Sequence, residues 1–208
     1  MSAAPKNAGF TLLELLITIS ILMVVTAFAV PSFQSFVMMN RLATEANEFV
    51  ASMNTARMEA IRGNTRGVLC RASVTNDQVS AADGCIQTTS GSWAGWMVFL
   101  DADGSGTYNP NATTNPGEVL LNTHVIRGSS SFRAIASSAL GTAGNRVVYR
   151  PDGLARAPGQ TLLQSATLRL CEISDTITLN ARDVRLGSGS RIGVSRSTSS
   201  SCATPADS

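Results

Sequence analysis

Oxygen-bearing side chains alternate in the short stretch Asp101-Ala102-Asp103-Gly104-Ser105-Gly106. Asp101, Asp103 and Ser105 stand first, third and fifth, and a glycine stands sixth, as at the start of a calcium-binding loop. The twelfth position, where such a loop has a bidentate glutamate, is Ala112. The pattern therefore favours an Asp- and Gly-rich turn between two strands, with calcium binding as the weaker alternative.

Four arginines near the carboxyl end are the main candidates for ligand binding. Arg182, Arg185, Arg191 and Arg196 lie within fifteen residues that contain one acid, Asp183. The surrounding Gly- and Ser-rich chain could approach phosphates, and such a cluster could hold DNA with a strong salt dependence. The stretch contains no aromatic residue for base stacking. A solvated surface is the favoured interpretation, and DNA binding is the alternative.

The four cysteines are Cys70, Cys85, Cys171 and Cys202. They form no CxxC pair, and His124 is the only histidine, so zinc and thioredoxin-like redox sites are disfavoured. Behind an export segment, an even number of cysteines favours two disulfides, for which the sequence permits three pairings. Pairing nearest neighbours would close two local loops, each worth roughly 2 to 4 kcal/mol.

Enzymatic chemistry has little support in the sequence. The chain has no nucleophile elbow, phosphate-binding loop, zinc-protease motif or dinucleotide fingerprint, and one histidine leaves little scope for acid–base catalysis. His124 is expected to be a surface residue or a hydrogen-bonded core residue. The sequence therefore predicts a protein without catalytic activity and without a cofactor.

Glu14 is the only charged residue in the 21-residue apolar run from Phe10 to Val30. As a helix this run is about 31 Å long, enough to cross the hydrocarbon core of a membrane. Ala27-Phe28-Ala29 would suit cleavage of an ordinary signal peptide. Neither a signal peptide nor a plain anchor explains Glu14, because a centrally placed acid costs roughly 2.5 to 3.5 kcal/mol on insertion scales.

A second apolar pattern follows Pro31, at which a helix can bend. Apolar residues recur at steps of four and three, which predicts an amphipathic helix, and they are Leu42, Ala46, Phe49, Met53, Ala56 and Ala60. Charged residues fall off this stripe and are expected in solvent; they are Arg41, Glu45, Glu48, Arg57 and Glu59. Gly63 is a candidate helix cap, so the sequence predicts one long helix from about 10 to 62.

Beyond Gly63, short apolar runs alternate with clusters of Gly, Ser, Asn, Asp and Pro, a pattern typical of strands and loops. The strand candidates are Arg66 to Ala72, Trp96 to Leu100, Gly117 to Asn122, Arg146 to Arg150, Ala166 to Cys171 and Ala181 to Leu186. Regular helices are hard to place there. The predicted fold class is α+β, a long amino-terminal helix followed by an antiparallel β domain.

Length and charge are consistent with this organisation. A chain of 208 residues suffices for one domain with an accessory segment. The net charge of +2 gives no general affinity for polyanions, and the cationic residues are fifteen arginines and Lys6. Basicity is therefore a local property of this chain.

The amino-terminal residues Gly9-Phe10-Thr11-Leu12-Leu13-Glu14 resemble the class III leader junction of type IV pilins and type II secretion pseudopilins. The resemblance implies that a prepilin peptidase cuts between Gly9 and Phe10, methylates Phe10 and leaves the apolar run in the mature protein. It also implies a role for Glu14 in assembly, since a buried carboxylate is tolerated when it pairs with the terminal amine of a neighbouring subunit.

Several stretches of the β domain resemble the GspH/FimT/FimU group of minor pilins and pseudopilins. They are Gly67-Val68-Leu69-Cys70, Trp93 to Asp101, Tyr149 to Gly153 and Leu168 to Cys171. Some FimT-type members bind DNA through a tail motif of the form G-R-x-R. Here the tail reads Gly189 to Arg196; only Arg191 matches a motif arginine, and Gly193 stands where the second is expected.

The resemblance implies a type IV pilin-like chain in four parts. Residues 1–9 are the leader, 10–30 the transmembrane helix, 31–62 its amphipathic continuation and 63–208 a periplasmic head domain with an Arg- and Ser-rich tail. The implied function is a FimT/FimU-like minor pilin of the inner membrane that primes or caps a filament. The alternatives are type II secretion protein H and a DNA-binding minor pilin. The implied partners are other minor pilins, the major subunit, prepilin peptidase and an inner-membrane assembly platform.

Overall fold

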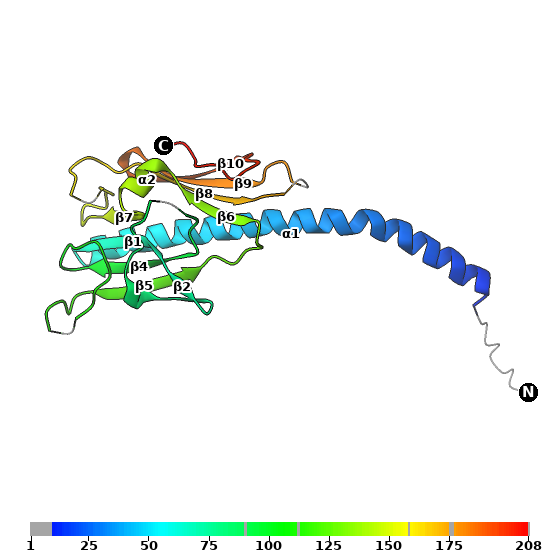
Figure 1. Cartoon of the computed structure of the whole chain (residues 1–208), viewed down its shortest axis with the longest axis horizontal. Helices are drawn as coiled ribbons and strands as arrows, with labels where there is room; N and C mark the ends of the chain where they lie inside the picture. The colour runs from blue at the N-terminus through cyan, green and yellow to red at the C-terminus, as the bar shows by residue number, and fades with distance from the viewer. Residues whose placement is uncertain (1–9, 90, 112, 158, 175–176, 208) are drawn as a thin grey trace, which may run out of the picture. The chain divides into compact units, whose positions relative to one another are not determined.

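The computed structural model describes residues 10–207 apart from 90, 112, 158 and 175–176. The chain divides into two compact units, the first up to Met38 and the second from Met39 onward. The predicted leader, residues 1–9, which ends at Gly9, lies outside the described residues. Helix α1, Leu12–Arg62, supplies the described helical part of the first unit and the beginning of the second (Figure 1).

Helix α1 confirms the long helix that the sequence predicts. It has 51 residues and ends one residue before Gly63. The backbone of Pro31 is helical, and the bend predicted at this residue stays a prediction. The second unit takes Met39–Arg62 together with the β domain, so the amphipathic half of the helix belongs to the head.

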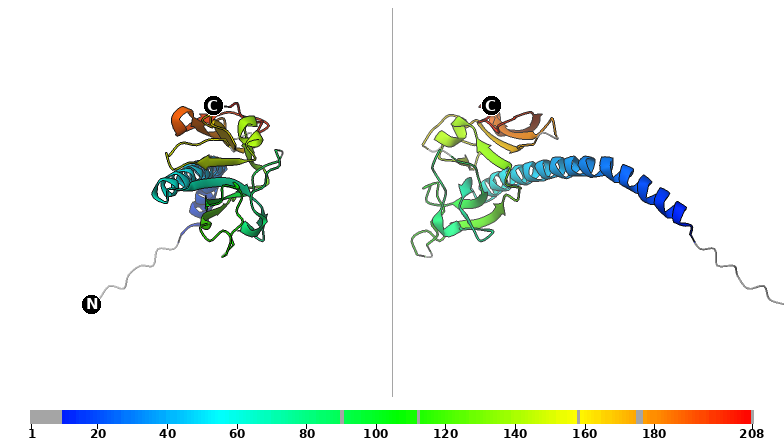
Figure 2. Two further views of the ribbon diagram at one scale, coloured as in Figure 1. Left: turned by 90° about the vertical axis from the view of Figure 1, so that its left-hand side faces the viewer. Right: turned by 45° about the vertical axis from the view of Figure 1, so that its right-hand side comes forward.

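The head contains two four-stranded antiparallel sheets (Figures 1 and 2). The first has the order β5-β4-β1-β7, where the strands are β1 Arg66–Ala72, β4 Gly95–Asp101, β5 Val119–Val125 and β7 Arg146–Tyr149. The second has the order β10-β9-β8-β6, where the strands are β6 Phe132–Ala136, β8 Ala166–Glu172, β9 Ala181–Gly187 and β10 Arg191–Ser197.

Short elements complete the head. They are a two-stranded hairpin of β2 Val74–Thr75 and β3 Gln78–Val79, the helix α2 Ser138–Thr142, and the 3-10 turns η1 Ala81–Asp83 and η2 Ser188–Ser190. All six predicted strands are present, while β2, β3, β6, β10 and α2 were not predicted. The segment that forms β10 reads as a Gly- and Ser-rich tail, and its strand conformation depends on pairing with β9, a tertiary contact.

The predicted apolar stripe of α1 forms part of the core of the head. Its six residues have 2% or less of their surface exposed, and they are Leu42, Ala46, Phe49, Met53, Ala56 and Ala60. Phe49 makes edge-to-face contacts with Trp96 of β4 and with Trp93, at centroid distances of 5.2 and 5.9 Å. Burying aromatic side chains contributes much of the stability of such a core.

Most of the charged residues expected on the solvated face of α1 are buried or half-buried. Glu45 is only 5% exposed, because its carboxylate bonds to the segment around His124, and Arg57 is half-buried because its guanidinium reaches the η2 turn. The prediction of a fully solvated polar face was therefore wrong at Glu45, and Arg41 and Glu59 are half-buried like Arg57. Periodicity identifies apolar stripes, but it does not reveal a polar side chain that has a partner in another element.

Two disulfides fasten the sheets, Cys70–Cys85 and Cys171–Cys202. This is the nearest-neighbour pairing among the three that the sequence permits. The first joins β1 to the segment after η1, and the second joins β8 to the carboxyl-terminal segment. That segment is also held by a hydrogen bond from Arg169 Nη1 to Ala203 O and by one from Ala139 N to Asp207 Oδ1.

Candidate functional site

The start of α1 is capped by reciprocal hydrogen bonds between Thr11 and Glu14. Glu14 N donates to Thr11 Oγ1 at 3.2 Å, and Thr11 N donates to Glu14 Oε2 at 2.9 Å. This is a capping box, in which a residue before the helix and one in its first turn satisfy each other's free N–H groups. Glu14 therefore has a partner within its own chain. The Thr-x-x-Glu spacing could have identified Thr11 from sequence.

The described residues of the chain leave the apolar part of the helix uncovered. Every residue from Phe10 to Val30 is exposed, and Phe10 is 91% exposed. The hydroxyls of Thr18, Ser20 and Thr26 donate to carbonyl oxygens one turn earlier in the same helix. The run is long and apolar enough to cross a membrane, and its few polar groups are satisfied internally, as lipid requires.

Three hydrogen bonds join the second half of α1 to β4, to β5 and to the segment after β5. Glu45 Oε2 lies 2.8 Å from His124 Nε2, and Glu45 Oε1 accepts from Arg127 N at 3.3 Å. Trp96 Nε1 donates to Ser52 Oγ at 2.9 Å, and its ring stacks on His124 at 4.3 Å. His124 is thus a hydrogen-bonded residue of the helix–sheet contact, one of the two environments that the sequence allowed.

The Asp101 stretch is a turn held together by its own backbone. Asp101 is 1% exposed and accepts from Gly104 N at 2.7 Å and Gly106 N at 3.0 Å. Asp103 Oδ1 accepts from Ser105 N, and Ser105 Oγ donates to Thr107 O. Burial raises the pKa of Asp101 in spite of these bonds. Within the described residues no group of three or more acidic, His or Cys side chains is arranged to hold a metal ion.

The structure separates the four tail arginines. Register pairs Arg196 with Arg182, and Arg185 with Gly193. Because strand residues alternate between faces, Arg182 and Arg196 share the face of the buried residues Val184 and Leu186. Arg185 and Arg191 lie on the opposite face. The four do not form one cationic surface, and DNA binding stays an untested prediction.

Their side chains also differ in environment. Arg182 is 6% exposed and donates to the carbonyl oxygens of Leu179 and Ala181. Its pKa is lowered by burial and by the neighbouring charge of Arg196. Asp183 is held by Arg169, with Nε–Oδ1 and Nη2–Oδ2 distances of 2.7 and 2.9 Å. Arg185, Arg191 and Arg196 are exposed.

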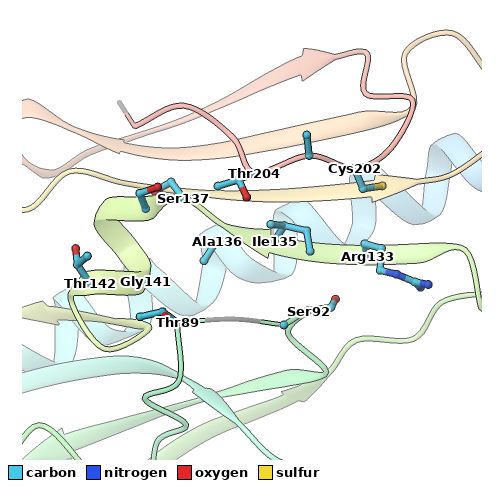
Figure 3. Close-up of a pocket in the computed structure, with 13 residues that line it drawn as sticks. Thr89, Ser92, Arg133, Ile135, Ala136, Ser137, Gly141, Thr142, Cys202 and Thr204 are labelled. Atoms are coloured by element: carbon cyan, nitrogen blue, oxygen red, sulfur yellow. The ribbon is translucent and has the colours of Figure 1, made fainter.

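A hollow of about 750 Å³ lies between β6, α2 and the carboxyl-terminal segment (Figure 3). Serine and threonine hydroxyls and small apolar residues line its wall, and Arg133 is its one titratable side chain among the described residues, since Cys202 is in a disulfide. Ser137 Oγ, at its edge, accepts from Leu140 N and Thr167 N. These residues supply no acid–base pair and no activated nucleophile.

Two family models match this sequence. The model described as the prokaryotic N-terminal methylation motif matches residues 4–30. The model described as type II transport protein GspH matches residues 45–198, which is most of the chain. The chain belongs to the GspH family. Proteins of this family are structural pilin or pseudopilin subunits, and the long helix with antiparallel sheets confirms the predicted fold class.

The comparison with curated proteins gave no match. Among solved structures, two crystal forms of the type IV minor pilin FimU from Pseudomonas aeruginosa (strain PAO1) are similar to this GspH-family chain. The first has a TM-score of 0.49 and 17% identity, and covers 81% of this chain and 99% of that one. The second has a TM-score of 0.45 and 15% identity, and covers 78% and 100%.

Proposed function

We propose that this GspH-family chain is a FimT/FimU-like minor pilin that primes or caps a filament. Residues 1–9 are removed by prepilin peptidase, Phe10 is methylated, and 10–30 anchor the subunit in the inner membrane with the head in the periplasm. The observation that carries the proposal is the apolar surface from Phe10 to Val30, which is exposed throughout. Such a surface needs lipid before assembly and neighbouring subunits afterwards. Other pilins and an inner-membrane platform are the partners.

Mass determination of the mature amino terminus tests the processing step. The expected product begins at Phe10 and carries one methyl group on its amine. A chain that begins at Val30 would show removal of the apolar run and would contradict a pilin role.

Glu14→Gln separates assembly from helix capping. Glutamine can replace glutamate in a capping box, so the helix start is kept while the charge is removed. If Glu14 pairs with the Phe10 amine of a neighbour, the variant should enter sheared filaments about tenfold less, as measured by immunoblotting. Thr11→Ala is the control, since it breaks the cap and keeps the carboxylate. Equal incorporation of Glu14→Gln and wild type would refute the pairing.

The description of the family model, type II transport protein GspH, supports a second candidate, a pseudopilin of protein secretion. Deletion of the gene distinguishes the two. Loss of surface fibres and twitching identifies a pilus subunit, whereas loss of exoprotein export identifies the pseudopilin.

A further inference from the structure

Strand β10 is an open edge of the second sheet. In the described part of the chain, the backbone of Arg191–Ser197 pairs with β9 and with no other element. None of its seven residues is buried. An edge of this kind presents free N–H and C=O groups to which another strand can add.

The edge carries an excess of positive charge. Strand β10 carries Arg191 and Arg196 and no acid, and the one acid of the neighbouring strand β9, Asp183, has both oxygens bonded to Arg169 of β8. Arg185 Nη2 lies 3.7 Å from Asp183 Oδ2, and no described carboxylate forms an ion pair with Arg182, Arg191 or Arg196. Arg182 and Arg196 lie directly opposite each other, an unfavourable pairing of like charges. An added carboxylate would relieve it.

The division of the arginines between two faces indicates what kind of partner fits. A DNA duplex approaches from one side and would meet Arg185 and Arg191, or Arg196, but not all of them. A strand added to the edge projects alternate side chains to both faces of the sheet. It would therefore meet Arg196 on one face and Arg191 on the other, with Ile192 and Val194 offering apolar contacts on the Arg196 face.

We propose that β10 is the acceptor edge for an acidic, extended segment of a different pilin-type subunit, added as a fifth strand of the second sheet. A second copy of this chain is a poorer occupant, because β10 against β10 would set arginines against arginines. The proposal rests on the proposed function, since it requires a filament partner. It goes further by naming the surface, the chemistry of the partner and the geometry of their contact.

Photo-crosslinking of the full-length chain in its own membrane tests the proposal. Benzoylphenylalanine at Val194, which is 47% exposed, reports on β10, and the same residue at Leu22, 61% exposed, reports on the apolar helix. The expected product at 194 is a crosslink to another pilin-type subunit. Arg191→Glu with Arg196→Glu should reduce that product about fivefold or more, and leave the crosslink at 22 unchanged.

The matched control reverses the charge of two exposed arginines outside the edge, Arg62→Glu with Arg127→Glu, and should preserve the crosslink at 194. A milder variant, Arg191→Gln with Arg196→Gln, should give an intermediate loss if the full reversal disturbs folding. Crosslinks at 22 without any at 194 overturn the acceptor edge and leave the pilin role intact. Crosslinks from 194 to DNA or to a second copy of this chain also overturn it, as does a yield that the β10 variants leave unchanged. Absence of subunit crosslinks at both sites overturns the proposed function itself.

Discussion

Leu12–Met38 and Met39–Arg62 are parts of one helix, yet their side chains meet opposite surroundings. From Leu12 to Val30 every residue is exposed, whereas the later part buries six apolar residues within its own head. Polar residues follow the same division. Thr18 and Ser20 bond to their own helix, while Glu45 and Ser52 bond to β5, β4 and the segment beyond. The first part depends on lipid or other subunits for cover, and the second supplies its own.

The comparison predicts that equal truncations in the two parts have unequal effects. Phe49→Ala should lower the free energy of unfolding of the head by about 3 to 5 kcal/mol, because it leaves a cavity against two tryptophans. Phe33→Ala, at a 67% exposed position, should change it by about 0.5 kcal/mol or less. Denaturant titration of the full chain in detergent micelles, followed by tryptophan fluorescence, measures both. Similar losses of unfolding free energy in the two variants would show that the head extends along the helix as far as Phe33.

A hydrogen-bonded pair within the head part sharpens the contrast between buried and exposed polar groups. Glu45→Ala leaves His124 and the amide of Arg127 without their acceptor and should destabilise the head by about 3 kcal/mol. Glu48→Ala removes the same group from an exposed position on the same helix and should stay within about 0.5 kcal/mol. The same titration applies. A small effect at Glu45 would mean that water replaces its carboxylate.

Serine occurs in both parts and provides a matched pair. Ser52→Ala leaves the buried indole N–H of Trp96 without an acceptor and should cost about 1 to 2 kcal/mol. Ser20→Ala leaves nothing unpaired, since the carbonyl of Leu16 can keep its helical bond, and should have almost no effect. The near-ultraviolet circular dichroism of Trp96 should change in the first variant alone. An effect at Ser20 would indicate a contact outside its helix.

The smallest expected effect is at the start of α1. Thr11→Val removes the hydroxyl of the capping box and should weaken the first turn by about 1 kcal/mol. Hydrogen exchange of the Leu12–Leu15 amides in micelles should become faster, while the stability of the head is unchanged. Unaltered exchange would show that the surrounding detergent, and not Thr11, holds the helix start.

Features set by local pattern were predictable from sequence, and features set by pairing were not. The helix from 10 to 62 and six strands follow from spacing and turn residues, and the structure has them. Strand β10 was missed because Arg, Gly and Ser make up most of it and give it weak strand propensity until β9 pairs with it. The clustering of four arginines in sequence likewise did not reveal their separation, which depends on the register of two strands.

For the same reason, some residues of the candidate site were predicted from sequence and others were not. Glu14 stood out because a lone acid in an apolar run is costly, but its partner Thr11 went unnoticed although Thr-x-x-Glu is a recognisable pattern. Glu45 and His124 are 79 residues apart, and no local signal links them. Long-range polar contacts of this kind require the fold before they can be assigned.

Strand β10 is tethered at both ends. Before it, Ser190 is fully buried. Its carbonyl oxygen accepts a hydrogen bond from Arg57, and its hydroxyl accepts one from Ala155 N. After it, the chain is bonded covalently to β8 through Cys202. A strand restrained in this way cannot leave its sheet to be exchanged between subunits. The head can therefore accept a strand from a neighbouring subunit, but it cannot donate β10 to another subunit. Successive strand additions would then run in one direction only.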